Sequence, residues 1–321
     1  MPQGQDPMVA RRRLKDALRR QREAAGFTQR QVADEMDWSP SKLIRIEAGQ
    51  VAVSTTDLRA LLQHYGVVDP VRVAALEALS RTARERAWWS NYRNVANADL
   101  RAFLGFETSA SIIRNFEPLN VPGLLQTREY AREILAAVDQ QSIDELVDLR
   151  MERQELLTRD EAPEVHFIMS QAVIERVAGG PRVMRRQLRH IARVAAYPNV
   201  TVRIVPWTVG FFPRYRVAYT VFEFPDAEDP AILCREGPTG DIITREGPLE
   251  DTPNDYLASF WEIEREAPAT DTPALLQAAI DTMTRLIGEA APGSLTPVDA
   301  PDDEDEEDPD GQEEPLAGSS S

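Results

Sequence analysis

The sequence predicts a mainly helical chain with an N-terminal five-helix bundle, a mixed α+β second domain of helices and a small sheet, and a disordered acidic tail. Three observations predict this. Apolar residues recur at three- and four-residue spacing early in the chain, and β-branched and aromatic segments alternate with helical ones after that. Proline, glycine, serine and acidic residues predominate at the end. We therefore expect domains over residues 8–87 and 88–287 and a tail over residues 288–321.

The first two helices have clear boundary signals. A helix is expected from about residue 8 to residue 25, where Gly26 ends it. Thr28 and Gln31 then match a capping box, in which each side chain satisfies a backbone N–H group at the helix start. This second helix is short and leads into a turn at Asp37, a residue type that tolerates left-handed backbone.

Three more helices follow at short intervals. Ser39 as N-cap, with Pro40 in the first helical position, predicts a helix that Gly49 closes. Capping residues also predict helices over residues 54–66 and 69–86. The apolar residues expected to form one shared core are Leu14, Leu18, Val32, Met36, Leu43, Ile46, Leu58, Leu61, Leu62 and Tyr65.

The second domain is expected to mix helices and strands, because its apolar periodicity changes repeatedly. The expected helices span residues 98–116, 127–138, 142–159, 170–178, 181–196, 257–265 and 273–287. The expected strands span residues 165–169, 200–205, 217–224, 231–234 and 241–245.

The net charge of -17 is unusual for a nucleic-acid-binding protein, but the charge is segregated along the chain. Residues 1–90 carry 15 basic and 11 acidic side chains, whereas residues 287–321 carry 12 acidic ones and no basic ones. This asymmetry is typical of a nucleic-acid-binding module with an acidic tail. The tail is either a solvating appendage or a segment that competes with DNA for the basic face.

Several functional classes are disfavoured by the composition. The chain has no apolar run of about 18 residues and no secretory signal pattern, so we expect a cytoplasmic protein without membrane contact. A single cysteine, Cys234, excludes an internal disulfide, and its apolar surroundings predict a buried thiol. His64, His166 and His190 lie on separate elements without a metal-binding or phosphate-binding motif, so no enzyme, metal site or cofactor is expected.

Residues 28–49 have the spacing of a helix-turn-helix, in which one helix braces the DNA backbone and the next enters the major groove. Over residues 11–66 the chain resembles the XRE family of Cro/434 repressor-like regulators. The resemblance implies a lambda-repressor-like bundle that binds double-stranded DNA with helix 40–48. The residues that carry it are Thr28, Gln29, Val32, Ala33, Ser39, Ile46, Glu47 and Gly49.

The same resemblance implies which side chains contact DNA. Arg45 is the best base reader, because arginine can donate two parallel hydrogen bonds to guanine, a contact worth about 1–3 kcal/mol of discrimination. Gln29 matches the family's phosphate-contacting glutamine, and Pro40 cannot read bases by hydrogen bonding. Residues 11–13 are weaker phosphate candidates, and Arg30 can equally be a solvated surface residue. The expected DNA-contacting residues are Gln29, Arg30, Ser39, Pro40, Ser41, Lys42, Arg45 and Gln50.

Two features of this segment concern its geometry rather than its contacts. Glu47 would be repelled by DNA, and the resemblance implies that it forms an internal ion pair with Arg22. Asp37 replaces the glycine usual in this turn, and Trp38 is larger than the usual apolar residue, which can shift the recognition helix slightly.

The second domain resembles the C-terminal domain of actinobacterial antitoxin-like transcriptional regulators between residues 88 and 266, with more proline and acid than expected after Gly240. That domain has no established function, and members are often encoded beside a short partner protein. Its run 122–127 is either an architectural turn and helix cap or a partner-binding site. The motifs that carry the resemblance are Trp88-Trp89-Ser90, Phe116-Glu117, Val121-Pro122-Gly123-Leu124-Leu125-Gln126-Thr127 and Tyr130-Ala131-Arg132.

The sequence therefore predicts a DNA-binding transcriptional regulator that acts as a homodimer, because one small recognition helix reads only a few base pairs. The alternative is an antitoxin-like protein that mainly sequesters a small protein encoded nearby. A crowded aromatic loop is expected to be either an interface or part of the core. It contains Trp207, Phe211, Phe212 and Tyr215.

Overall fold

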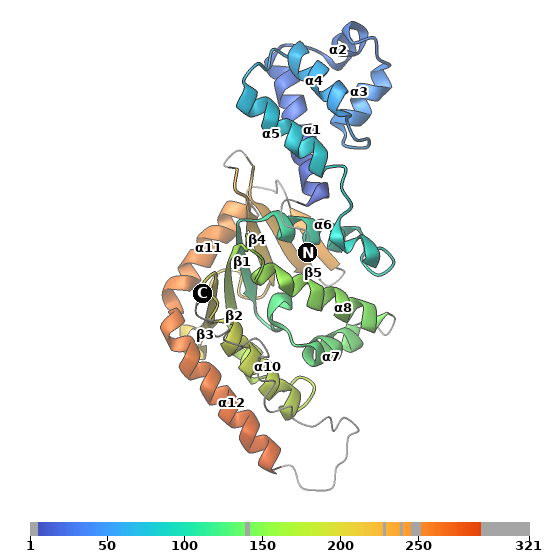
Figure 1. Cartoon of the computed structure of the whole chain (residues 1–321). Coiled ribbons are helices and arrows are strands. Elements are labelled where there is room, and N and C mark those ends of the chain that lie inside the picture. Colours follow the sequence, from blue (N-terminus) through green and yellow to red (C-terminus); the bar gives the residue numbers. More distant parts are fainter. Residues whose placement is uncertain (1–5, 139–141, 227–228, 238–239, 245–251, 290–321) are drawn as a thin grey trace, which may run out of the picture.

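The computed structural model describes residues 6–138, 142–226, 229–237, 240–244 and 252–289. A helical bundle forms one end of the molecule, and a larger domain with a central sheet forms the rest (Figure 1). The predicted fold class, mainly helical with a mixed α+β second domain, is confirmed. Almost all of the expected acidic tail lies outside the described residues.

The N-terminal bundle contains the five helices that the sequence predicts. Their buried apolar side chains form one cluster, which includes the expected core residues except Met36; Met36 is only partly buried against it. Each helix begins at an N-cap whose side chain accepts a hydrogen bond from a backbone N–H group. The helices are α1 (Pro7–Ala24), α2 (Gln29–Glu35), α3 (Pro40–Glu47), α4 (Thr55–His64) and α5 (Pro70–Thr82).

The connection between α2 and α3 has the conformation expected from the sequence. Thr28 and Gln31 form the predicted capping box at the start of α2. Asp37 adopts the left-handed region with a φ of 55°, as Gly49 does after α3 with a φ of 70°. The left-handed Asp37 lets the chain reverse within a few residues, so α2 and α3 pack directly against each other.

The second domain is built on a six-stranded mixed sheet with the order β3-β2-β1-β4-β5-β6. Strands β1, β2 and β3 are parallel neighbours, and β4, β5 and β6 continue the sheet antiparallel from β1. The strands are β1 (Ile112–Glu117), β2 (Glu164–Ser170), β3 (Val200–Val205), β4 (Tyr219–Glu223), β5 (Ile232–Gly237) and β6 (Gly240–Thr244).

Helices cover both faces of this sheet, because alternate strand residues are apolar on each side. In β2, Val165 and Phe167 belong to the larger core cluster, whereas Ile168 belongs to the cluster formed with α11. Cys234 is buried on the larger side, as expected. The helices are α6 (Ala98–Ser109), α7 (Arg128–Val138), α8 (Ile143–Gln154), α9 (Gln171–Glu175), α10 (Pro181–Val194), α11 (Pro253–Glu266) and α12 (Thr272–Glu289).

One sequence prediction is wrong. The expected helix 98–116 ends at Ser109, and residues 112–117 form β1 at the centre of the sheet. No proline or glycine separates the two segments, so the local pattern gives no boundary signal. The strand forms because its backbone groups pair with β2 on one side and with β4 on the other.

The run from Val121 to Thr127 is largely buried within the fold. The Gln126 side chain donates to the carbonyl of Val121 at 2.7 Å and accepts from Arg150 at 2.7 Å. Gln187 on α10 bonds the backbone on both sides of Gln126, accepting from the N–H of Thr127 and donating to the carbonyl of Leu125. These contacts favour the architectural reading of the run.

Helix α1 is shared by both domains. Its C-terminal half packs in the core of the bundle, whereas Val9 in its first turn lies in the core of the second domain (Figure 1). The N-cap Asp6 accepts from the indole Nε1 of Trp89 at 2.9 Å, and its N–H donates to Ser109 at 2.8 Å. Burial raises the pKa of Asp6, and the hydrogen bonds from Met8 and Trp89 oppose that shift. The first turn of α1 is therefore anchored in the second domain.

We predict that Trp89→Phe destabilises the full chain by about 2 kcal/mol, because a buried carboxylate loses a hydrogen-bond donor. Chemical denaturation measures the loss, and amide hydrogen exchange should show faster opening of the first turn of α1. Trp261→Phe is the matched control, since Trp261 is 49% exposed on α11. Equal stability of the two variants would contradict this role for Trp89.

Candidate nucleic-acid interface

The outward side of α3 is the candidate DNA-reading surface. Leu43, Ile46 and Glu47 are buried against the bundle, and the opposite side carries exposed residues. Ser41, Ile44, Arg45 and Ala48 follow one another at three- and four-residue spacing, and all four are exposed. They therefore form one continuous stripe along the helix.

Pro40 and Ser39 lie at the N-terminal end of this stripe and Gln50 at its other end, all three exposed. The Ser39 hydroxyl accepts from the N–H of Lys42 at 3.3 Å, so this side chain is engaged as a helix cap. The N–H of Gln50 donates to the carbonyl of Arg45 at 2.9 Å, which fixes the backbone after α3.

Lys42 does not join the outward stripe. Its ammonium lies 3.6 Å from the centroid of the Trp38 ring and 3.1 Å from the carboxylate of Asp57 on α4. The large Trp38 thus supplies a cation–π partner that holds the lysine side chain toward the start of α4. Lys42 therefore lies beside the outward stripe and not within it.

Two residues of the stripe were missed by sequence reasoning. Ile44 is 48% exposed and Ala48 is exposed, although both are apolar and were not assigned to the DNA-contacting set. Apolar side chains on a recognition helix can contact the methyl group of thymine. The three- and four-residue spacing from Ser41 was the available signal.

The arginines at residues 11–13 do not lie on this surface. The Arg11 guanidinium donates to the carbonyl of Ala83, and that of Arg12 lies 5.5 Å from the centroid of the Phe106 ring. Arg13 contacts Asp226 of the second domain. These weaker phosphate candidates are instead engaged around the junction of the two domains.

The C-terminal end of α3 is fixed by a buried ion pair. The Arg22 guanidinium donates two hydrogen bonds to Glu47, from Nε to Oε1 at 2.7 Å and from Nη2 to Oε2 at 3.0 Å. Hydrogen bonding to Glu47 raises the pKa of Arg22. Arg22 also donates to the carbonyl of Phe27, which ties the end of α1 to the start of the loop. The internal pair implied by the sequence resemblance is present.

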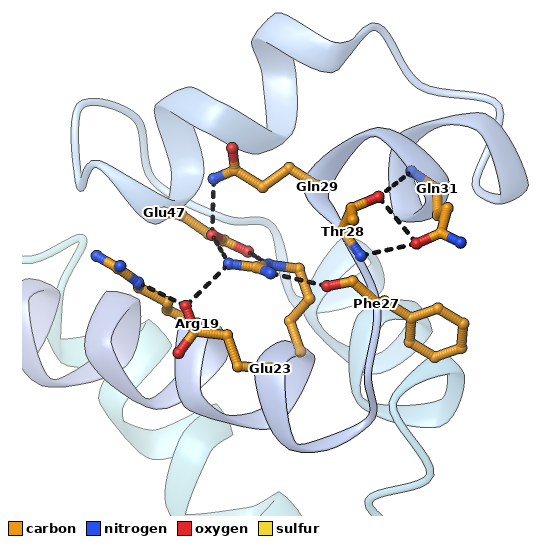
Figure 2. Close-up of polar contacts among 8 residues, drawn as sticks. Arg19, Glu23, Phe27, Thr28, Gln29, Gln31 and Glu47 are labelled. Carbon is orange, nitrogen blue, oxygen red and sulfur yellow. Dashed lines mark hydrogen bonds and ion pairs between the residues drawn. The ribbon is translucent and has the colours of Figure 1, made fainter.

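Gln29 joins the same network. Its Nε2 donates to Glu47 at 2.8 Å, so its side chain lies between α2 and α3 (Figure 2). It remains partly exposed. Arg30 is exposed beside it, 4.0 Å from the carboxylate of Asp34 on the same helix. A surface pair at this spacing is worth little and leaves the arginine accessible to another anion.

No group of three or more histidine, cysteine, aspartate or glutamate side chains among the described residues is arranged to hold a metal ion. No helix among them combines the length and apolar character needed to cross a bilayer.

We predict that Glu47→Ala lowers the free energy of unfolding by about 3 kcal/mol, because it leaves the Arg22 guanidinium buried without its carboxylate. Arg19→Ala is the control, since it breaks an exposed pair with Glu23 and should cost less than about 1 kcal/mol. Thermal and chemical unfolding of the full chain measure both effects. An unchanged melting temperature in Glu47→Ala would refute the structural role of Glu47.

Two families of known proteins match separate parts of the chain. A family described as a helix-turn-helix domain matches residues 13–76, which contain α2, α3 and their connecting turn. The family described as Domain of unknown function (DUF5753) matches residues 100–272. No curated protein and no solved structure matches the chain. Because the second match covers more than half of the 321 residues, the chain belongs to the DUF5753 family and carries a helix-turn-helix domain before it.

Proposed function

We propose that this protein is a cytoplasmic, non-enzymatic transcriptional regulator that reads the major groove with α3 and is regulated through its second domain. The observation that carries the proposal is the exposed stripe on α3. It lies opposite the buried side of the helix, which the Arg22–Glu47 pair holds in place. A reading helix must present its side chains in a fixed orientation, because base discrimination depends on hydrogen-bond geometry. The Arg22–Glu47 pair, which holds α3 against the bundle, is consistent with that requirement.

Within this proposal Arg45 reads a guanine, and Ile44 and Ala48 contact apolar base edges. Gln29, Arg30, Ser39 and Lys42 flank the helix and contact phosphates, which set the position of the protein without reading sequence. The complete set of DNA-contacting residues that we propose is Gln29, Arg30, Ser39, Pro40, Ser41, Lys42, Ile44, Arg45, Ala48 and Gln50.

We also propose that the protein binds as a homodimer. The exposed stripe of α3 spans two helical turns, which is enough for only a few base pairs. Two copies on half-sites about one DNA turn apart give the usual route to adequate affinity. A one-to-one complex with a single half-site would argue against dimeric binding.

Selection of bound sequences from random DNA, carried out with the wild-type chain and with Arg45→Ala, tests the reading role of α3. Arg45→Ala should relax the preference at one guanine position and weaken binding to the selected site about tenfold, within the range of about 1–3 kcal/mol for one bidentate contact. The fold should be unchanged, because Arg45 is exposed.

Arg128→Ala is the matched control for this experiment, since Arg128 is paired with Asp148 on the surface of the second domain. It should leave both affinity and sequence preference unchanged. If the wild-type protein binds no duplex at low salt, or if Arg45→Ala selects the same sequences with the same affinity, the proposal fails.

A second candidate function is sequestration of a small protein partner by the second domain, as in an antitoxin-like regulator. The observation that favours it is the aromatic loop after β3, where Phe211 is 86% exposed and Trp207 is 60% exposed. Trp207 is held in place, because its Nε1 donates to Glu175 at 2.9 Å and its N–H to Gln171 at 3.0 Å. Exposed and preorganised aromatic side chains are typical anchors of protein interfaces.

The two phenylalanines of this loop differ in position, so they can distinguish a role in an interface from a role in the core. Phe212 packs against Phe116 with a centroid distance of 5.6 Å, whereas Phe211 contacts Tyr215 on the surface. We predict that Phe211→Ser abolishes co-purification with a small protein, if one is encoded beside the regulator, and keeps the melting temperature. Phe212→Ser should lower the melting temperature by removing a core contact. Unchanged co-purification with Phe211→Ser would contradict the partner-binding role.

A further inference from the structure

We propose that the acidic segment near the end of this chain, residues 299–314, binds a stripe of arginine side chains on α10 of the same chain. Helix α10 packs against α12, and α12 ends at Glu289, ten residues before the acidic segment begins. The site lies in the second domain, and its occupant is a part of the sequence that follows the described residues. The proposal does not depend on DNA binding by α3.

Five arginines lie on one side of α10, and this helix contains no acidic residue. They recur at three- and four-residue spacing, so they share one face of the helix. The opposite face is buried in the core of the second domain through Met184, Leu188 and Ile191. At 1.5 Å per residue the stripe is about 16 Å long. Its members are Arg182, Arg185, Arg186, Arg189 and Arg193.

Side chains of like charge at this spacing repel each other and destabilise a helix. Exposed arginines on other helices of this chain are offset by an acidic residue four positions away. Helix α10 has no acidic residue, so an anion that balances its stripe must come from outside the helix. The offset pairs on other helices include Arg19–Glu23 in α1, Arg30–Asp34 in α2 and Arg285–Glu289 in α12.

Two arginines of the stripe are accessible to such an anion. Arg186 already lies 3.6 Å from Glu129 of α7. Arg189 and Arg193 are exposed, and no carboxylate of the described residues forms an ion pair with either. The Arg193 guanidinium donates to Nδ1 of His190 at 2.9 Å, and burial together with the charge of Arg193 lowers the pKa of His190. A neutral imidazole accepts this hydrogen bond without cancelling the charge of Arg193.

The charge of the proposed occupant is complementary to that of the stripe. Residues 290–321 carry eleven acidic side chains and no basic ones, and all eleven fall within residues 299–314. Every position from 302 to 308 is acidic. Guanidinium groups bind carboxylates through strong, charge-assisted hydrogen bonds. A dense run of carboxylates therefore suits a row of arginines better than a single acidic residue does.

The connection between α12 and the acidic segment is long enough for this contact. Helix α12 runs alongside α10 to the end of the molecule opposite the bundle (Figure 1). The ten residues from Glu289 to Asp299 can span up to about 33–36 Å, which is about twice the length of the stripe. A binding group joined through a short connection has an effective concentration on the order of millimolar. A nucleic acid or a second protein, in contrast, must reach the stripe from solution.

Fluorescence anisotropy with a labelled peptide of residues 297–316 tests whether the stripe is open or occupied. In a neutral-tail chain, asparagine or glutamine replaces the eleven acidic residues of the full-length protein. We expect this chain to bind the peptide with a submillimolar dissociation constant at low salt and more weakly as salt rises. The wild-type chain should bind the peptide about tenfold more weakly, because its own tail competes for the stripe. Micromolar protein is used, so that the tails of other copies are too dilute to compete.

A double substitution locates the binding on α10. Arg189→Gln with Arg193→Gln, made in the neutral-tail chain, should weaken peptide binding about tenfold, because two accessible charges are removed. Arg128→Gln with Arg132→Gln is the matched control, since these α7 arginines are exposed at the same spacing but are paired with Asp148 and Asp144. The control should not change peptide binding. All four arginines are exposed, so each variant should keep its melting temperature.

The proposal is overturned if the neutral-tail chain does not bind the peptide at millimolar concentration, or if the wild-type chain binds it equally well. It is also overturned if a folded variant of Arg189 and Arg193 binds the peptide as before. Loss of binding in Arg30→Gln with Arg45→Gln instead would place the tail on the surface of α3 and contradict the proposal. Should the double variant of α10 fail to fold, Arg189→Gln alone decides the outcome through a smaller weakening.

Discussion

The orientation of α3 within the bundle depends on a single buried carboxylate. Glu47 at the end of α3 accepts hydrogen bonds from Arg22 on α1 and from Gln29 on α2, so three helices meet at one charged group. A carboxylate taken out of water is tolerated only when its oxygens are fully engaged, and this requirement restricts how the three helices can be placed. The same constraint gives the outward stripe of α3 a defined direction, which a purely apolar contact would specify less strictly.

Helix α1 carries this constraint beyond the bundle. It holds Arg22 near its C-terminal end and is anchored through Asp6 and Val9 in the second domain at its start. The helix is continuous over 18 residues, so its two ends cannot rotate independently without breaking backbone hydrogen bonds. Arg13 adds contacts with Asp226 and Asp229 between these ends. The position of α3 is thus mechanically linked to the DUF5753 domain.

The second domain combines a rigid interior with a more accessible rim. Its sheet is covered by helices on both faces. In the interior, Gln126 bonds the carbonyl of Val121, and Gln187 bonds the backbone of Leu125 and Thr127. The exposed aromatic residues lie on the loop after β3, and the ion pairs of Arg13 with Asp226 and Asp229 lie at the junction with the bundle. A stable scaffold with binding groups on loops and junctions is the usual arrangement for sites that recognise partners or ligands.

The sequence by itself determined the five N-terminal helices, their caps, the left-handed turn at Asp37 and the outward position of Arg45. These features follow from interactions within a few residues, which a local pattern records. Only the tertiary structure decided that residues 112–117 form a strand, because that strand depends on pairing with β2 and β4. It also decided that Lys42 turns toward Asp57 and that Arg13 contacts Asp226, since electrostatic partners distant in sequence leave no local signal.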